Sequence, residues 1–275
     1  MNQDWKKQSS MKWALPKQLS EKLSELWIPL LFFCFLILPT HSKAASFYQI
    51  QGGFRSTPQS SSVEAQYVYN EKLWSGGSDD PAWMYGYWKL GTFVAIHGQA
   101  GMKVEFFPLS LWQIQLQRSM TSRFYDTKTV DCSLYECRGV LQRGSFKTSI
   151  ALGYGDFFLV PSYSITDLTM DSPQKNFSSE EDNLVADKEG DQLVVFQEAL
   201  GYKQGNQKWV FVAKTSYMKK SRDSNSSQYL VWSQSPDKNL SYFVGAGQYR
   251  STYLKSSLSF VAGFSWTVGE NLSFF

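Results

Sequence analysis

Residues 260–275 read FVAGFSWTVGENLSFF, and this closing stretch decides the fold. Large apolar residues alternate with small or polar ones along it: Phe260, Ala262, Phe264, Trp266 and Val268 form one series, and Leu272 and Phe274 continue that series in register. A period of two over this length predicts a β-strand with one apolar face. Such a strand could close a soluble sandwich or a membrane barrel, and the pattern alone leaves both open.

Thr267, Gly269, Leu272 and Phe274 occupy a recognisable spacing near the terminus. A polar residue, then glycine two positions on, then two hydrophobic residues spaced by one resembles the C-terminal assembly signal of the Gram-negative outer-membrane β-barrel superfamily. No specific family within it is indicated. The resemblance implies an all-β, transmembrane, antiparallel up-and-down barrel, located in the cell outer membrane, with a periplasmic C-terminus.

The N-terminal region predicts export. An apolar run at 27–38 follows several lysines, and the small residues Ser42 and Ala44 favour cleavage after Ala44. The run is too short for a comfortable membrane-spanning helix, although an uncleaved anchor is the alternative. We expect a signal peptide at 1–44 and one barrel domain at 45–275. The formal net charge of +3 comes from the leader, so nothing favours nucleic-acid binding.

Alternating segments recur along the whole mature chain and predict about twelve strands, an even number as a bacterial barrel requires. The expected strands are 46–55, 62–73, 84–96, 99–107, 110–121, 138–151, 156–167, 191–202, 207–218, 228–235, 240–251 and 256–274. If 46–73 and 84–107 were each one bent strand, the number would be ten.

The polar series of these strands carries many more cations than acids. With apolar residues facing lipid, the pore-lining candidates are Arg55, Lys89, Lys103, Glu105, Gln113, Gln115, Gln117, Arg143, Lys147, Lys208 and Lys214. One hypothesis is a structural barrel whose lumen these side chains fill. The other is a porin-like path for small polar or anionic solutes.

The connections fall into two kinds, short turns and long polar stretches at 121–137, 168–190 and 218–227. Short turns on the periplasmic side and longer loops outside are typical of the fold. Counting back from the C-terminus places every long stretch outside. We expect the acidic 168–190 stretch to be a solvated loop, and a surface-binding role for the loops is a further hypothesis.

Cys132 and Cys137 are the cysteines that remain after the leader, and they lie in one of these polar connections. An even pair in an exported chain predicts a disulfide that stiffens the loop. No histidine lies nearby, so no metal site is expected.

His97 is the only histidine of the mature chain, and no catalytic motif surrounds it. A general base needs a positioned partner, so we predict that the protein is not an enzyme and uses no cofactor. An outer-membrane lipid- or peptide-modifying enzyme centred on His97 is the alternative. The expected partners are outer-membrane lipid and lipopolysaccharide, with the barrel assembly machinery acting during insertion. Nucleic acid is not expected as a partner, and the protein is expected to be monomeric.

Overall fold

The computed structural model describes residues 44–74, 85–124, 131–171, 173–179, 183–252 and 256–269. The chain divides into two compact units, 1–42 and 43–275, and every described residue belongs to the second. The predicted signal peptide, apart from Ala44, and the signal residues Leu272 and Phe274 lie outside the described residues. Among the described residues, no helix is both long enough and apolar enough to cross a membrane.

The second unit is built from β-strands, most of them 10 to 15 residues long. In chain order the strands are β1 (Ala44–Arg55), β2 (Ser60–Trp74), β3 (Gly86–Ala95), β4 (Gln99–Leu109), β5 (Trp112–Arg123), β6 (Gly139–Ile150), β7 (Leu152–Tyr154), β8 (Phe157–Met170), β9 (Phe177–Ser179), β10 (Leu184–Ala186), β11 (Asp191–Gln204), β12 (Gln207–Met218), β13 (Ser224–Gln234), β14 (Leu240–Ser251) and β15 (Ser257–Gly269).

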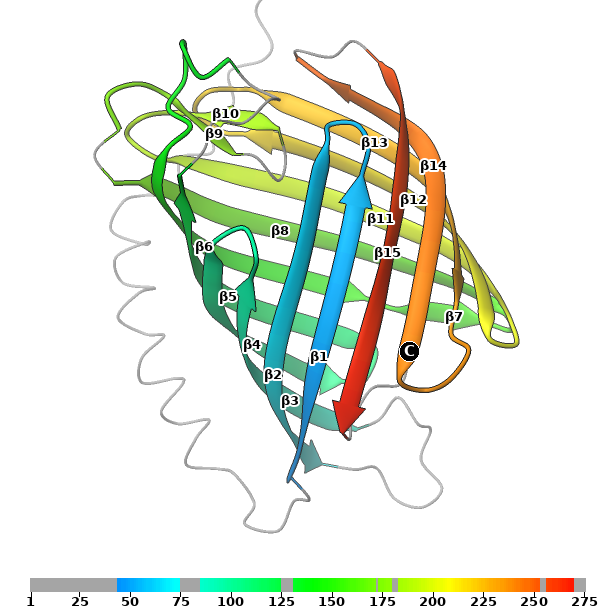
Figure 1. Cartoon of the computed structure of the whole chain (residues 1–275). Helices are drawn as coiled ribbons and strands as arrows, with labels where there is room; N and C mark the ends of the chain where they lie inside the picture. Colours follow the sequence, from blue (N-terminus) through cyan, green and yellow to red (C-terminus); the bar gives the residue numbers. More distant parts are fainter. Residues whose placement is uncertain are drawn as a thin grey trace, which may run out of the picture. The chain divides into compact units, whose positions relative to one another are not determined.

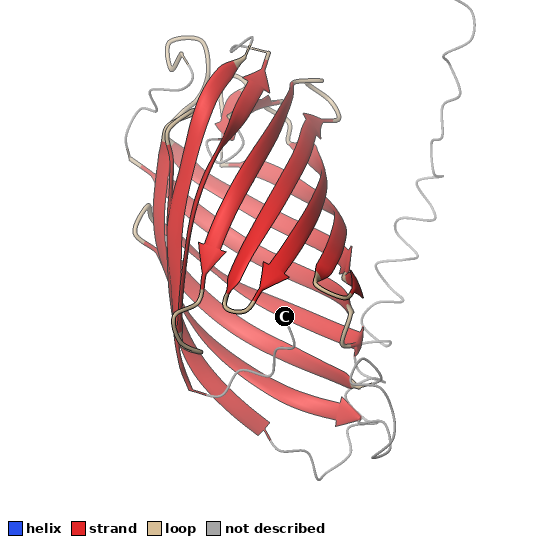
Figure 2. Ribbon diagram, turned by 90° about the vertical axis from the view of Figure 1, so that its right-hand side faces the viewer, coloured by secondary structure: helices blue, strands red, loops and turns tan. Residues whose placement is uncertain are grey.

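Twelve of these strands form a closed antiparallel barrel (Figures 1 and 2). Successive barrel strands pair with one another, and β1 pairs with β15 as well as with β2, which closes the sheet. At this seam Gln49 lies opposite Thr267, and its side-chain amide donates to Ser265 Oγ at 2.6 Å. The predicted twelve-stranded barrel is confirmed, and the soluble sandwich is wrong.

The ten-stranded alternative is wrong because both proposed bent strands are hairpins. Residues 56–59 turn the chain between β1 and β2. Residues 96–98 do so between β3 and β4, where Gly98 has a φ of 83° and its amide donates to Ala95 O at 3.1 Å. Glycine reaches this left-handed conformation without the steric cost that other residues bear, which permits the tight turn.

The outer face of the barrel is apolar on every strand. At least one large exposed hydrophobic side chain comes from each of the twelve: Tyr48, Tyr67, Leu90, Met102, Met120, Ile150, Leu159, Phe196, Phe211, Leu230, Val244 and Phe260. In water this arrangement would be strongly unfavourable, but a hydrocarbon surrounding suits it. Closure also leaves no open sheet edge, as a membrane requires.

The two ends of the barrel differ in their connections. We call the end with the short connections 110–111, 151–156, 205–206 and 235–239 the turn end, and the end with 124–138 and 171–190 the loop end. The last described residue, Gly269, lies at the turn end of β15. In bacterial outer-membrane barrels the short turns are periplasmic and the longer loops face outside, and we expect the same orientation for the turn end and the loop end here.

Candidate functional site

The barrel lumen is the candidate site, because the polar series of every strand points into it. Side chains alternate between the exposed apolar face and a more buried polar face along the strands. All the predicted lining residues lie on the inward face of their strands: Arg55, Lys89, Lys103, Glu105, Gln113, Gln115, Gln117, Arg143, Lys147, Lys208 and Lys214.

Several inward lysines lie near Glu105 in the lumen. Lys103 Nζ and Glu105 Oε1, both on β4, are 3.9 Å apart. Lys147 on β6 interacts electrostatically with Glu105, Lys214 and Lys103. Lys89 on β3 also interacts with Glu105, so three lysines share this carboxylate. We call Lys103, Lys147 and Lys214 the lumen lysines.

Amide and hydroxyl side chains line the β5 and β6 wall next to the lumen lysines. Gln115 Nε2 donates to Gln117 Oε1 at 3.0 Å, and Ser149 Oγ donates to Gln113 Oε1, also at 3.0 Å. These partly buried groups satisfy one another and remain half exposed to the interior. Such a wall can exchange hydrogen bonds with water or with a polar solute.

Lys89 lies nearer the turn end and differs from the lumen lysines in its surroundings. Its Nζ is 5.7 Å from the centre of the Phe47 ring, 5.5 Å from that of Tyr87 and 5.8 Å from that of Phe107. Tyr87 and Phe107 stack at 4.1 Å. Cation–π contacts hold the ammonium in place. Lys89 also lies opposite Glu105 and interacts electrostatically with it and with Lys103, so it links this aromatic wall to the charged group of the lumen.

The turn end opens as a polar basin of about 680 Å³ beside the β1–β15 seam. Lys203, Lys208 and Lys238 supply positive charge there, and Asp237 supplies one carboxylate. The Asp237 carboxylate accepts the backbone amides of Asn239 and Leu240, at 2.7 and 2.9 Å, and so is engaged by its own turn. The basin therefore presents cations to solvent.

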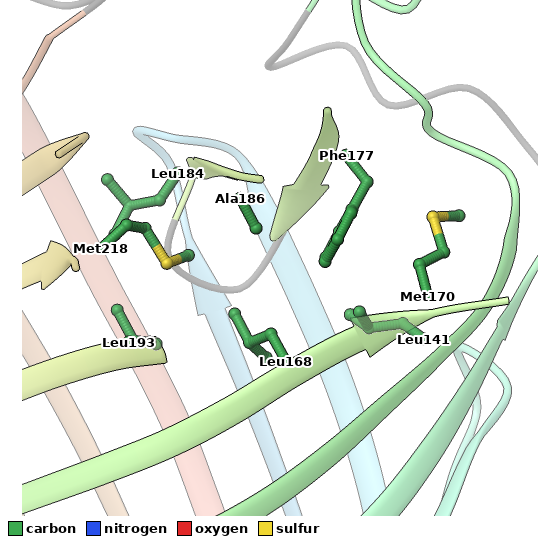
Figure 3. Packing of buried hydrophobic residues seen from close by; sticks show 8 residues of the cluster. All are labelled: Leu141, Leu168, Met170, Phe177, Leu184, Ala186, Leu193 and Met218. Carbon is green, nitrogen blue, oxygen red and sulfur yellow. The ribbon is translucent and has the colours of Figure 1, made fainter. Parts of the chain in front are cut away.

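The loop end is filled by a hairpin that folds inward. Strands β9 and β10 pair with each other, and all six of their residues are buried. Their apolar side chains pack on inward residues of β6, β8, β11 and β12 (Figure 3). The resulting cluster consists of Leu141, Leu168, Met170, Phe177, Leu184, Ala186, Leu193 and Met218. An apolar core thus lies inside the barrel at this end.

Polar contacts attach both strands of the hairpin to the barrel wall. Arg123, at the loop end of β5, donates from Nη1 to Ser178 O at 2.7 Å and to Ser178 Oγ at 3.1 Å. On the other strand, the amide of Val185 donates to Asp223 Oδ2 at 2.8 Å, and Ser221 Oγ donates to Val185 O at 2.6 Å. Charge-assisted bonds of this kind are stronger than neutral ones.

The basic stretch 219–222 is organised around an acid of the neighbouring loop. Asp191 accepts the backbone amides of Lys220 at 2.8 Å and of Ser221 at 2.9 Å. Lys219 Nζ donates to the side-chain oxygen of Gln192. The carboxylate therefore holds the β12–β13 loop against the start of β11, which brings Ser221 and Asp223 to the hairpin.

The predicted disulfide is present and braces the same hairpin. Cys132 and Cys137 are bonded, which confirms the pairing. Within this loop, the amide of Glu136 donates to Asn176 O at 2.8 Å, and the amide of Ser178 donates to Glu136 O at 3.1 Å. Lys175 Nζ also donates to Ser133 O at 2.8 Å. The disulfide loop thus pairs with the start of β9, where Glu136 lies opposite Phe177.

Asp131 begins the disulfide loop and has a perturbed acidity. Ser133 donates to its Oδ1 twice, from the hydroxyl at 2.6 Å and from the backbone amide at 2.9 Å. These two bonds stabilise the carboxylate and lower the pKa of Asp131 below its ordinary value. The ionised form therefore favours the folded turn.

The expectation of a solvated loop over 168–190 is wrong for 177–179 and 183–186, which are buried. Acidic residues dominate the composition of the stretch and hide a short apolar signal, Phe177 followed by Leu184-Val185-Ala186. Those side chains gain an apolar surface only after the barrel forms. A period-two search over long segments does not detect so short a hairpin.

His97 lies in the three-residue turn between β3 and β4, at the loop end. Its Nε2 is 3.0 Å from Gln99 Oε1, and Gln99 in turn donates to Ser119 Oγ at 3.3 Å. Across the part of the chain that the structure describes, no acid or nucleophile hydrogen-bonds to this imidazole. Within the same residues, no group of three or more His, Cys, Asp or Glu could hold a metal ion.

No model of a known protein family matches the chain, and no curated protein is significantly similar in sequence. Solved structures of similar fold include the outer-membrane expressed OmpT of Vibrio cholerae, which is 11% identical with a TM-score of 0.44, covering 82% of this chain and 97% of that one. An anion-selective porin from Comamonas acidovorans is 8% identical (TM-score 0.39; 83% and 100% covered). The translocator domain of autotransporter NalP from Neisseria meningitidis is 10% identical (TM-score 0.39; 90% and 97% covered).

The assignment of the fold rests on the chain's own strand order, closure and apolar exterior. These features make the protein a closed, twelve-stranded antiparallel β-barrel whose exterior suits a membrane.

Proposed function

We propose that this barrel is a narrow pore for small polar or anionic solutes, narrowed at its outer end by the β9–β10 hairpin. The observation that carries the proposal is the group of inward lysines: Lys103 and Lys147 interact with Glu105, and Lys214 interacts with Lys147. Rings of cationic side chains favour anions in water-filled pores. The alternative is a barrel whose role is structural only.

The charges are arranged in sequence along the barrel axis, which supports a path rather than a filled interior. The cations of the basin at the turn end, Lys203, Lys208 and Lys238, would attract an anion from the periplasmic side. The lumen lysines and the glutamine wall lie further along. No covalent chemistry is required by this role, so we propose that the protein is not an enzyme.

We also propose that the barrel works as a monomer among lipopolysaccharide and other outer-membrane lipid, after insertion by the assembly machinery. Exposed apolar side chains occur on all twelve barrel strands rather than on one side. A protein partner would cover one sector, whereas lipid covers the whole circumference.

The test is single-channel recording of the purified protein in planar bilayers, with a salt gradient to measure ion selectivity. We expect small conductance steps and a reversal potential of the sign for anion preference. The variant Lys147→Gln/Lys214→Gln should move that potential toward zero, because it removes two of the cations that set the preference.

The matched control is Lys188→Gln/Arg250→Gln, which removes the same charge from an outer loop and from the outward face of β14. It should leave the reversal potential unchanged. No conductance above bare lipid would establish the structural alternative, and equal effects of the two double variants would contradict the role of the lumen lysines.

A further inference from the structure

The lipid-facing side of the barrel carries a hollow of about 600 Å³ across β4, β5, β6 and β8. Most residues that line it belong to the outward series of those strands: Met102, Val104, Leu116, Arg118, Phe146, Ile165 and Asp167, with Gly144 among them; Gln117 and Ser145, which alternate with them, also border it. The hollow is therefore separate from the lumen and from the pore proposed above.

Gly144 creates the hollow. It pairs with Arg118 on β5 and with Asp167 on β8, so the three residues form one row across the outer face. A Cβ built at Gly144 would meet no atom within 4 Å. Neighbouring strands lie about 4.8 Å apart, so adjacent side chains normally fill the space between them. Gly144 has no side chain, and a depression therefore remains between the long side chains of Arg118 and Asp167.

The floor of the hollow is apolar on its turn-end side. Leu116, Phe146 and Ile165 form the next row toward the turn end, in register with one another. On the loop-end side the next outward row holds Met120, Gln142 and Thr169, so polar side chains begin to appear, and Gln142 Nε2 donates to Asp171 Oδ1 at 3.2 Å. The hollow therefore lies where the apolar band of the barrel meets its polar outer rim.

The two charged residues of the row differ in their partners. Asp167 accepts Gln192 Nε2 at 2.8 Å, which engages its carboxylate within the protein. For Arg118, which is exposed, the described residues offer no hydrogen bond or ion pair. A guanidinium carries five donors in a planar fork that matches a phosphate, and at the edge of the hydrocarbon region it lacks bulk water to satisfy them.

We propose that this hollow binds one phosphate-bearing lipid of the outer leaflet. The phosphate accepts hydrogen bonds from Arg118, and one acyl chain lies over Gly144 against Leu116 and Phe146. A free phosphate would leave the apolar floor uncovered, and a neutral lipid would leave the guanidinium without an acceptor. Only an amphipathic, anionic lipid matches both halves of the site.

The experiment is native mass spectrometry of the full-length purified barrel, released from detergent and titrated with bisphosphorylated lipid A. We expect one tightly retained lipid. Arg118→Gln removes the phosphate donors, and Gly144→Leu fills the hollow with a side chain that suits the membrane. Each should weaken retention by roughly tenfold, which corresponds to about 1.4 kcal/mol.

Arg250→Gln is the matched control, since it removes an exposed outward arginine from β14, away from the hollow. It should retain the lipid as the parent protein does. Heat-modifiable migration on a gel shows that each variant is folded, and Arg118→Gln alone decides the question if Gly144→Leu does not fold.

Two further titrations distinguish binding of a lipid phosphate from binding of free inorganic phosphate. Dephosphorylated lipid A should bind at least tenfold more weakly, and millimolar inorganic phosphate should not displace the retained lipid. Equal retention by all variants, equal binding of the dephosphorylated lipid, or displacement by inorganic phosphate would each overturn the proposal.

Discussion

The two ends of the lumen are built on opposite principles, although the same strands run through both. At the loop end, a hairpin brings Phe177 and Leu184 inside, and the interior becomes an apolar core. At the turn end, short connections leave a basin of about 680 Å³ lined by cations and hydroxyls. The contrast shows that two features pack the loop end: the long 171–190 connection supplies the hairpin, and the barrel strands supply apolar inward residues such as Leu141, Leu168 and Leu193.

Truncating the apolar side chains of the hairpin should change the single-channel conductance more than any other substitution described below. Phe177→Ala/Leu184→Ala removes two fully buried side chains, and losses of about 3–5 kcal/mol are typical for one large buried residue. The hairpin should leave the barrel mouth while the strands stay intact. Single-channel conductance should rise by several fold, with unchanged heat-modifiable migration; equal conductance would show that the hairpin does not narrow the path.

Substitution of Arg123, which holds the hairpin to β5, should raise the single-channel conductance less than the loss of the apolar core does. Arg123→Gln loses charge-assisted bonds to Ser178, each worth about 1.5–3 kcal/mol. We expect frequent brief openings rather than a permanent one, visible as added noise in the current. Arg250→Gln is the control, since it removes the same charge from the outward face of β14, and it should record like the parent protein.

Loss of the Cys132–Cys137 disulfide should affect the protein less than the hairpin-core substitutions or the Arg123 substitution. Cys132→Ser/Cys137→Ser frees a loop that pairs with the start of β9, and a ring this small contributes about 2 kcal/mol at most. Proteolysis of the 131–137 loop should become faster, while barrel stability in denaturant should stay the same. A large loss of barrel stability would contradict a local role.

The smallest effect concerns acidity at the start of that loop. The pKa of Asp131 lies below its ordinary value because Ser133 donates to its carboxylate. A lowered pKa means that the contribution is present above the ordinary value of about 3.9 and is lost as the pH falls through the folded-state pKa. Ser133→Ala should raise the pKa of Asp131 toward the ordinary value, measurable by carboxyl NMR titration. An unchanged pKa would remove Ser133 as the cause.

Sequence patterns predict the barrel strands well because lipid imposes one rule on all of them. Residues 207–218 and 240–251, for example, were expected as strands and are the bounds of β12 and β14. Most outward residues at membrane depth must be apolar whatever their neighbours are, so alternation is visible in a single sequence.

The interior follows no such rule, which is why the hairpin could not be predicted. Whether Leu184 is buried depends on Leu168 and Met218, which come from distant strands. The inward position of Lys147 follows from its strand phase, but its proximity to Lys214 requires the closed barrel. Which inward side chains contact one another depends on how the barrel closes, and that arrangement cannot be read from any short stretch of the sequence.

The pairing of β1 with β15 has a consequence for how the protein folds. Gln49 and Ser265, which bond across the β1–β15 seam, are 216 positions apart. Length itself is a small obstacle, since closure costs only about 0.6 kcal/mol more for each doubling of the loop. The greater hazard is that both edges stay open, with unpaired backbone groups, until the last strand has been synthesised. A chain that lacked only β15 would keep every earlier hairpin and still be a sheet ready to pair with its neighbours, so the final strand is also the protection against aggregation.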